Sequence, residues 1–113
     1  MTTSKRGRTE ILQGMLDMLI LKTLSQEPLH GYGVAQRLRL LSGDRIHIPQ
    51  GSLYPCLHRL ENRRLLKGRW VETPGGRRAK YYDLTAKGRT RLQTEIEGWH
   101  QLSHAIGLVL GPA

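Results

Sequence analysis

A short helix followed at once by a basic hairpin constrains this chain more than any other feature. The segment from Gly51 to Leu84 opens with an amphipathic stretch, one face of which carries Leu53, Leu57 and Leu60. Two strand-like stretches follow, separated by a Pro-Gly-Gly turn. A helix that can enter a groove, beside a hairpin with a cationic tip, is what a winged helix-turn-helix presents to duplex DNA.

Positive charge is concentrated on and just after this unit. The chain of 113 residues carries 18 Lys and Arg against nine Asp and Glu, a formal net charge of +9. Eleven of the 18 cations, but only three of the acids, lie between Arg59 and Arg91. This balance favours a polyanionic partner, and on charge alone nucleic acid and an anionic membrane surface both fit.

Length and cysteine content narrow the class of protein. A chain of 113 residues is expected to form one domain with a modest core. Cys56 is the only cysteine, which excludes an intrachain disulfide and a cysteine-rich zinc module. The sequence has no apolar run of membrane-spanning length and no signal-peptide pattern at its N-terminus. We therefore expect a cytoplasmic protein without a membrane partner.

The N-terminal helix is expected over residues 9–24 and is apolar on more than one face. Residues 1–8 are expected to form a disordered basic arm, in which Lys5, Arg6 and Arg8 either touch DNA or only solubilise the chain. Two apolar faces exceed what one small core can bury, so the second face indicates a partner chain. A central helix wrapped by its own domain is the alternative.

Five further segments are expected before the last helix. A helix over residues 31–41 is followed by a short extended piece at residues 46–48, just before the helix that begins near Ser52. The two strands of the hairpin are expected at residues 69–73 and 79–84, which are rich in good strand formers.

The last helix is expected over residues 86–110, with Thr85 as its N-cap. Its apolar residues are spaced by three and four: Leu92, Ile96, Trp99, Leu102, Ile106 and Val109. This near-heptad pattern predicts a dimerisation helix. The expected fold class is mainly α with a small β-wing: a winged helix-turn-helix over residues 9–85, whose first helix shares the dimer interface, plus a C-terminal dimerisation helix.

Base reading is expected from the first half of the helix near Ser52, because that part of the motif enters the major groove. The outward candidates are Gln50, Ser52, Tyr54 and His58. Glutamine can pair with adenine, and a tyrosine hydroxyl can donate to a phosphate or a base. Two alternatives stay open: Ser52 acts only as an N-cap, or Tyr54 packs under the wing. Pro55 fits the first turn of this helix.

Phosphate contacts are expected from cations on the same helix and at the hairpin tip. They are Arg59, Arg63 and Arg64 on the helix and Arg77, Arg78 and Lys80 on the hairpin. A solvated basic helix face and a flexible solvated loop are the alternatives. Glu61 is expected to pair with one of the helix arginines, and Trp70 to lie in the core of the hairpin base.

Trp99 lies on the apolar seam of the last helix, where a dimer could enclose a cavity between its subunits. With Met15 of the first helix it is the candidate for binding a small-molecule effector. Interface packing alone is the alternative for Trp99.

Catalytic and metal chemistry find no support. Glu97, His100 and His104 share a helix, but a metal site needs three or four converging ligands and no second cluster accompanies them. No Ser, His and Asp pattern supports a nucleophilic triad, and the Gly75-Gly76 pair lacks the Lys-Ser/Thr of a phosphate loop. We expect no enzyme, no metal and no cofactor, and a buried thiol at Cys56.

The chain resembles the PadR family of bacterial transcriptional regulators from about Thr9 to Leu110. The motifs that carry the resemblance are LHGYGVAQRL at 29–38, GSLYPCLHRLE at 51–61, the wing up to Tyr81-Tyr82, and LTAKG at 84–88. The single short C-terminal helix resembles the smaller subfamily. The resemblance implies a homodimer whose last helix packs against the partner's first and last helices, and repression relieved by a small molecule or another signal.

By matching motif positions, the resemblance also implies DNA contacts for Ser52, Tyr54 and the wing arginines. A winged-helix module that binds a protein partner, without specific DNA binding, is the competing function. The basic wing argues against it, because protein interfaces deplete lysine.

Overall fold

The computed structural model describes residues 15–112, and it is mainly helical with one small sheet. Residues 15–24 are helical. The later elements are β1 (Leu29–His30), α2 (Gly31–Leu41), α3 (Gln50–Asn62), β2 (Leu66–Glu72), β3 (Arg78–Leu84) and α4 (Ala86–Leu110). The expected fold class of a mainly α chain with a β-wing is confirmed, whereas the basic arm over residues 1–8 lies outside the described residues.

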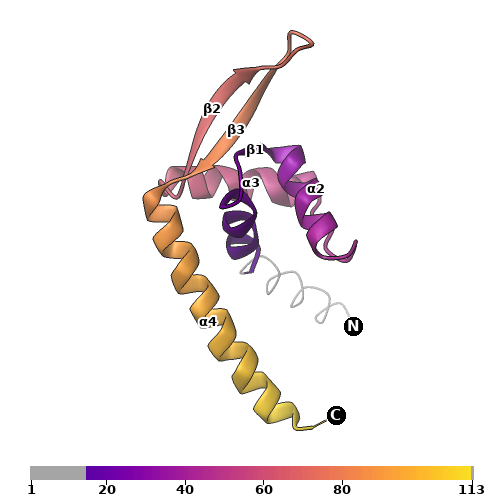
Figure 1. Ribbon diagram of the computed structural model, residues 1–113, viewed down its shortest axis with the longest axis vertical. Coiled ribbons are helices and arrows are strands. Elements are labelled where there is room, and N and C mark those ends of the chain that lie inside the picture. Colours follow the sequence, from indigo (N-terminus) through magenta and orange to yellow (C-terminus); the bar gives the residue numbers. More distant parts are fainter. Residues whose placement is uncertain (1–14, 113) are drawn as a thin grey trace.

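The sheet is antiparallel, with strand order β1-β3-β2. β2 and β3 pair from Leu66 opposite Leu84 to Glu72 opposite Arg78, and Figure 1 shows the resulting hairpin projecting beyond the helices. At its tip Gly76 has φ of 81°, a conformation that glycine adopts without strain, and its N–H donates to the Thr73 carbonyl at 2.9 Å. The expected hairpin is therefore present, with both strands longer than predicted.

The third strand lies elsewhere than the sequence suggested. Residues 46–48 form a loop, not an extended strand, because the Ile46 N–H donates to Ser42 Oγ at 2.8 Å and is not available to a sheet. The third strand is β1, in which Leu29 and His30 pair with Tyr82 and Tyr81 of β3.

α3 begins two residues before the expected start, with Pro49 in the N-cap position. The Pro49 carbonyl accepts from the N–H groups of Ser52 and Leu53, both at 3.0 Å. Ser52 is therefore already inside the helix and is not its N-cap. Pro55 lies in the helix interior, not in its first turn. The helix ends at Asn62, and Arg64 takes a positive φ of 64° as the chain turns into β2.

The core packs around α3. Its largest fully buried side chains come from residues 15–24, α2, α3 and β2: Ile20, Leu21, Val34, Leu53, Leu57, Leu60 and Leu66. The spacing of Leu53, Leu57 and Leu60 places them on one face of α3, as predicted, which leaves the opposite face of this helix to solvent.

α4 starts from a tightly packed joint with the body. The Thr85 hydroxyl accepts from the Gly88 N–H at 2.9 Å and donates to the Arg64 carbonyl at 2.8 Å, which confirms Thr85 as the N-cap. A Cβ on Gly88 would lie 2.2 Å from the Leu65 carbonyl oxygen, so only glycine allows this approach.

Beyond this joint α4 leaves the body (Figure 1), and every residue from 97 to 112 is exposed. No helix within residues 15–112 has the length and apolarity that a membrane span requires.

Candidate nucleic-acid interface

The exposed face of α3 carries three of the four residues that the sequence assigned to base reading. Gln50, Tyr54 and His58 are exposed and lie four residues apart, so they form one stripe along the helix. Ser52 lies beside this stripe and is half-buried. The stripe faces away from the core, so a duplex groove can approach it.

Tyr54 also contacts α2. This contact bears on the alternative that Tyr54 packs against the protein and does not read bases. A Cβ on Gly31 would lie 2.7 Å from the Tyr54 ring, so the ring rests directly on the first residue of α2. The side chain nevertheless remains 45% exposed. Tyr54 is therefore packed on one side and open to solvent on the other.

Two of the six cations expected to contact phosphate are ion-paired within the body. Arg59 donates to Asp17, and Lys80 donates to Glu61 at 2.8 Å. Glu61 thus pairs with a wing lysine and not with a helix arginine, because β3 crosses the end of α3; it also accepts from the Gly68 N–H at 3.2 Å. The hydrogen bond to Glu61 raises the pKa of Lys80.

Asp17 connects the helix over residues 15–24 to α3. Besides the Arg59 guanidinium, it accepts from the Cys56 thiol at 3.0 Å. Burial, together with this hydrogen bond and the negative charge of Asp17, raises the pKa of Cys56 to about 12. Cys56 is the buried thiol that the sequence predicted, and it stays protonated at neutral pH.

The remaining four cations are exposed and have no acidic partner among residues 15–112. They are Arg63, Arg64, Arg77 and Arg78. Arg63 and Arg64 follow the last turn of α3, and Arg77 and Arg78 stand at the tip of the wing. These four side chains carry unneutralised charge that the region offers to a polyanion, and the exposed Lys67 and Arg89 add to it.

Trp70 is not part of the hairpin core, contrary to expectation. It lies on β2 opposite Lys80, is 59% exposed, and has the Arg78 guanidinium 5.3 Å from its ring centroid. Side chains alternate between the two faces of a strand, so Trp70 shares its face of β2 with Leu66. Leu66 is buried at the base of the hairpin, whereas Trp70, four residues further along, is left exposed. Tyr32, at the start of α2, is a second exposed aromatic that the sequence reasoning did not select.

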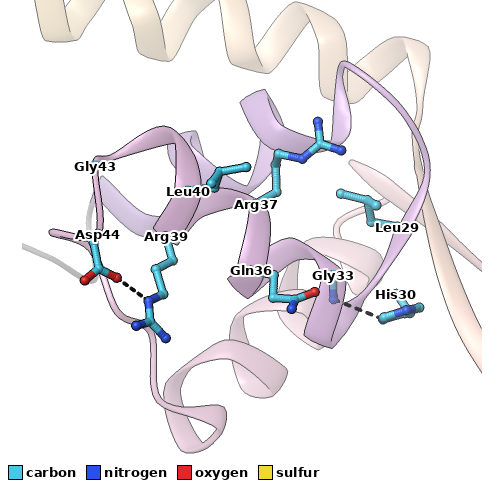
Figure 2. Close-up of a pocket in the computed structure, with 9 residues that line it drawn as sticks. All are labelled: Leu29, His30, Gly33, Gln36, Arg37, Arg39, Leu40, Gly43 and Asp44. Atoms are coloured by element: carbon cyan, nitrogen blue, oxygen red, sulfur yellow. Dashed lines mark hydrogen bonds and ion pairs between the residues drawn. The ribbon is translucent and has the colours of Figure 1, made fainter.

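A hollow of about 760 Å³ lies along α2 and the loop that follows it (Figure 2). Its two arginines are already neutralised, since Arg37 pairs with Glu27 and Arg39 pairs with Asp44. This hollow therefore offers a polyanion less free charge than the wing does.

The two candidate effector residues lie on different helices. Trp99 is on the exposed part of α4, and Met15 is half-buried on the helix over residues 15–24. Neither residue lines the hollow of Figure 2. Within residues 15–112 no three His, Cys, Asp or Glu side chains converge as metal ligands, and His100 and His104 have no third partner there.

A three-helical core, a basic wing and an open face on α3 define a winged helix-turn-helix of the kind found in transcriptional regulators. The model of the "Transcriptional regulator PadR-like family" matches residues 20–94, and the chain belongs to this family of transcriptional regulators.

Two solved structures illustrate the likeness. A PadR family transcriptional regulator from Eggerthella lenta is 30% identical with a TM-score of 0.80, covering 99% of this chain and 96% of its own. A PadR-like transcription factor from Bacteroides fragilis is 33% identical with a TM-score of 0.75, covering 92% and 98%. Among curated sequences, an uncharacterised protein of Lysinibacillus sphaericus is 25% identical over 91% of this chain and 94% of its own length.

Proposed function

We propose that this chain is a homodimeric, sequence-specific DNA-binding repressor whose binding is relieved by a small-molecule effector. One observation carries the DNA-binding part. The exposed stripe of Gln50, Tyr54 and His58 on α3 adjoins a wing whose tip presents Arg77 and Arg78 without acidic partners. Side chains that can read bases therefore lie beside side chains that can hold phosphate.

The proposed roles follow the contacts of each side chain. Gln50, Ser52, Tyr54 and His58 read the major groove from the first half of α3. Arg63, Arg77 and Arg78 hold phosphates or, at the wing tip, the minor groove. In the free protein Arg59 is paired with Asp17, and Lys80 is paired with Glu61. Each of these two cations reaches DNA only by leaving its acidic partner.

Dimerisation is supported by the outer part of α4. Its large apolar side chains Trp99, Leu102 and Ile106 are exposed in the single chain and repeat at intervals of three and four. Exposed apolar surface of this kind is stabilised by a second copy. Two copies would place two α3 helices against half-sites about 34 Å apart.

The effector part of the proposal assigns a small molecule to the subunit interface near Trp99 and Met15. A ligand there would act by binding one arrangement of the two subunits, DNA-bound or free, more tightly than the other. A winged helix that binds only a protein partner is the competing function.

The test is binding of the full chain to a duplex from the region upstream of its own coding sequence, with a random duplex as reference. We expect log Kd to rise steeply with log salt concentration, because each phosphate contact contributes a slope of about 0.9. Arg77→Ala with Arg78→Ala should weaken binding to both duplexes by roughly tenfold or more and flatten the salt dependence. Gln50→Ala should instead erode the preference for the upstream duplex.

Arg91→Ala is the control for the loss of an arginine outside the proposed interface, because Arg91 pairs with Glu95 on α4 at 2.8 Å and is not assigned to DNA. Binding that does not depend on salt, or a wing double variant that binds like Arg91→Ala, would contradict the proposed interface.

A further inference from the structure

The aromatic side chains of this chain are gathered at one place. The sequence has four tyrosines, two tryptophans and no phenylalanine. Five of these six side chains line a single hollow of about 400 Å³: Tyr32, Tyr54, Trp70, Tyr81 and Tyr82. Only Tyr82 is buried, so the cluster is not a hydrophobic core. We call this hollow the aromatic notch.

The aromatic notch lies where the first turn of α2, the exposed stripe of α3 and the wing meet. Gly31 provides the close contact to Tyr54, whose ring a Cβ would meet at 2.7 Å. The His30 ring packs edge-on against Tyr81 at 5.3 Å between centroids and stacks with Tyr32 at 6.4 Å. The walls are thus rings that come from β1, α2, α3, β2 and β3. Tyr32 and Trp70 stay more than half exposed.

The polar groups of the notch suit an anion. Its lining includes Arg78 and Lys80 and no acidic residue. Lys80 is held by Glu61, so Arg78, lying against Trp70, brings the unmatched charge. His30 Nδ1 accepts from the Gly33 N–H at 3.0 Å, which leaves Nε2 as the donor of the neutral ring.

The occupant must therefore combine a negative group with an apolar body that can lie against aromatic rings. A nucleotide unit of a DNA strand has both, in its phosphate and its deoxyribose. The notch also adjoins two parts of the proposed interface, since Tyr54 belongs to the stripe on α3 and Arg78 to the wing tip.

We propose that the aromatic notch seats one sugar-phosphate unit of the bound duplex. The rings of Trp70 and Tyr54 lie against the deoxyribose, and Arg78, His30 and the Tyr32 hydroxyl donate to the phosphate. This inference rests on the proposed DNA-binding function and adds His30, Tyr32 and Trp70 to the interface. A contact to the backbone carries no sequence information, so the notch contributes affinity and orientation but not base preference.

The first experiment compares Trp70→Ala and Trp70→Phe in binding to the upstream and random duplexes. Trp70→Ala should weaken both about tenfold and leave their ratio unchanged, because the contact is to the backbone. Trp70→Phe keeps a ring and should bind within about threefold of wild type. Tyr32→Phe, which removes only a hydroxyl, should weaken both duplexes roughly threefold to tenfold. Since both side chains are exposed, the melting temperatures should match wild type.

The second experiment uses Trp70 as its own reporter. Adding saturating duplex should protect wild-type tryptophan fluorescence from acrylamide quenching, and this protection should disappear in Trp70→Phe, where only Trp99 emits. Duplex binding is followed in the same samples by the anisotropy of a labelled strand.

Three results would overturn the inference while leaving DNA binding intact. The first is that Trp70→Ala and Tyr32→Phe bind both duplexes as tightly as the wild type does. The second is that acrylamide quenching of wild-type tryptophan fluorescence does not change at full duplex occupancy. The third is a loss confined to the upstream duplex, which would make the notch a base reader. If the wild-type protein binds neither duplex, the proposed function fails, and this inference fails with it.

Discussion

The winged-helix body and the outer part of α4 are opposites in how they treat apolar side chains. In the body, Leu57 and Leu60 are wholly buried, and no leucine of α3 is exposed. In α4, Leu102, Ile106 and Val109 are exposed although they follow the same helical spacing. The difference indicates that α3 buries its apolar side chains in the core of the body, whereas the outer part of α4 leaves them exposed, as the end of α2 does at Leu40 and Leu41. Exposed apolar patches of this kind are typical of interaction surfaces.

A second contrast concerns charge. Arg59 and Lys80 near the middle of the body are paired with acids, while Arg77 and Arg78 at the wing tip are not. The unpaired cations sit at the end of the molecule remote from the bare part of α4 (Figure 1). The surfaces that we propose for polyanion binding and for dimerisation are therefore separate, so a substitution in one should leave the other unchanged.

The largest effect is expected from the same substitution made in the two regions. Leu57→Ala should lower the free energy of unfolding by about 2–5 kcal/mol, because it opens a cavity in a fully buried site. Leu108→Ala, on an exposed position of α4, should change it by less than about 0.5 kcal/mol. Urea denaturation at one fixed protein concentration measures both. Equal losses would mean that the two regions are packed alike.

The next effect tests whether the bare seam of α4 meets a second copy. Leu102→Asp with Ile106→Asp should raise the dimer dissociation constant roughly 100-fold or more, since two carboxylates cannot be buried without partners. Gln101→Asp is the control for a carboxylate placed outside the seam, because position 101 lies on the helix face opposite Leu92. Sedimentation velocity separates monomer from dimer. A double variant that remains as dimeric as the control would remove α4 from the interface.

A smaller effect is expected at the link between residues 15–24 and α3. Asp17→Asn should cost about 1 kcal/mol of stability, because it weakens the ion pair with Arg59 and the hydrogen bond from Cys56. A double-mutant cycle with Arg59→Gln measures the part that belongs to the pair. Additive losses in the cycle would show that the two side chains act independently.

The smallest energetic effect at neutral pH concerns the Cys56 thiol. With a pKa of about 12 in the folded protein against 9.0 ordinarily, the thiol should react with iodoacetamide at pH 8 only after unfolding in urea. Because the folded pKa is the higher one, the protonated thiol contributes stability that is present below about pH 9 and is lost as the pH rises towards 12. Rapid labelling of the native protein would contradict this environment.

The sequence predicted the elements whose signals are local. The bounds of α2 and α4 agree with expectation, because Thr85 caps one end of α4 and Gly111, with φ of 74°, ends the other. β1 was missed because two residues form a strand only when β3 offers a free edge, and that edge comes from residues far along the chain.

The candidate site was predicted in outline but not in its pairings. Arg59 looked like a free cation because its partner Asp17 lies 42 residues away, and Glu61 finds Lys80 across 19 residues. The aromatic notch likewise joins Tyr32 to Trp70 through the fold alone. The base-reading and phosphate roles remain predictions until DNA binding is measured.

The close contact at Gly88 sets the angle at which α4 leaves the body, and the length of α4 amplifies any change in that angle. The helix is about 37 Å long at 1.5 Å per residue, so a tilt of about 10° at its base would move its far end by about 6 Å. The Leu65 carbonyl lies where a Cβ on Gly88 would have to be. The base of α4 therefore has no room for a larger side chain at this position. Gly88→Ala would thus change the angle between α4 and the body, and this change would displace the far end of α4 relative to any surface that it contacts.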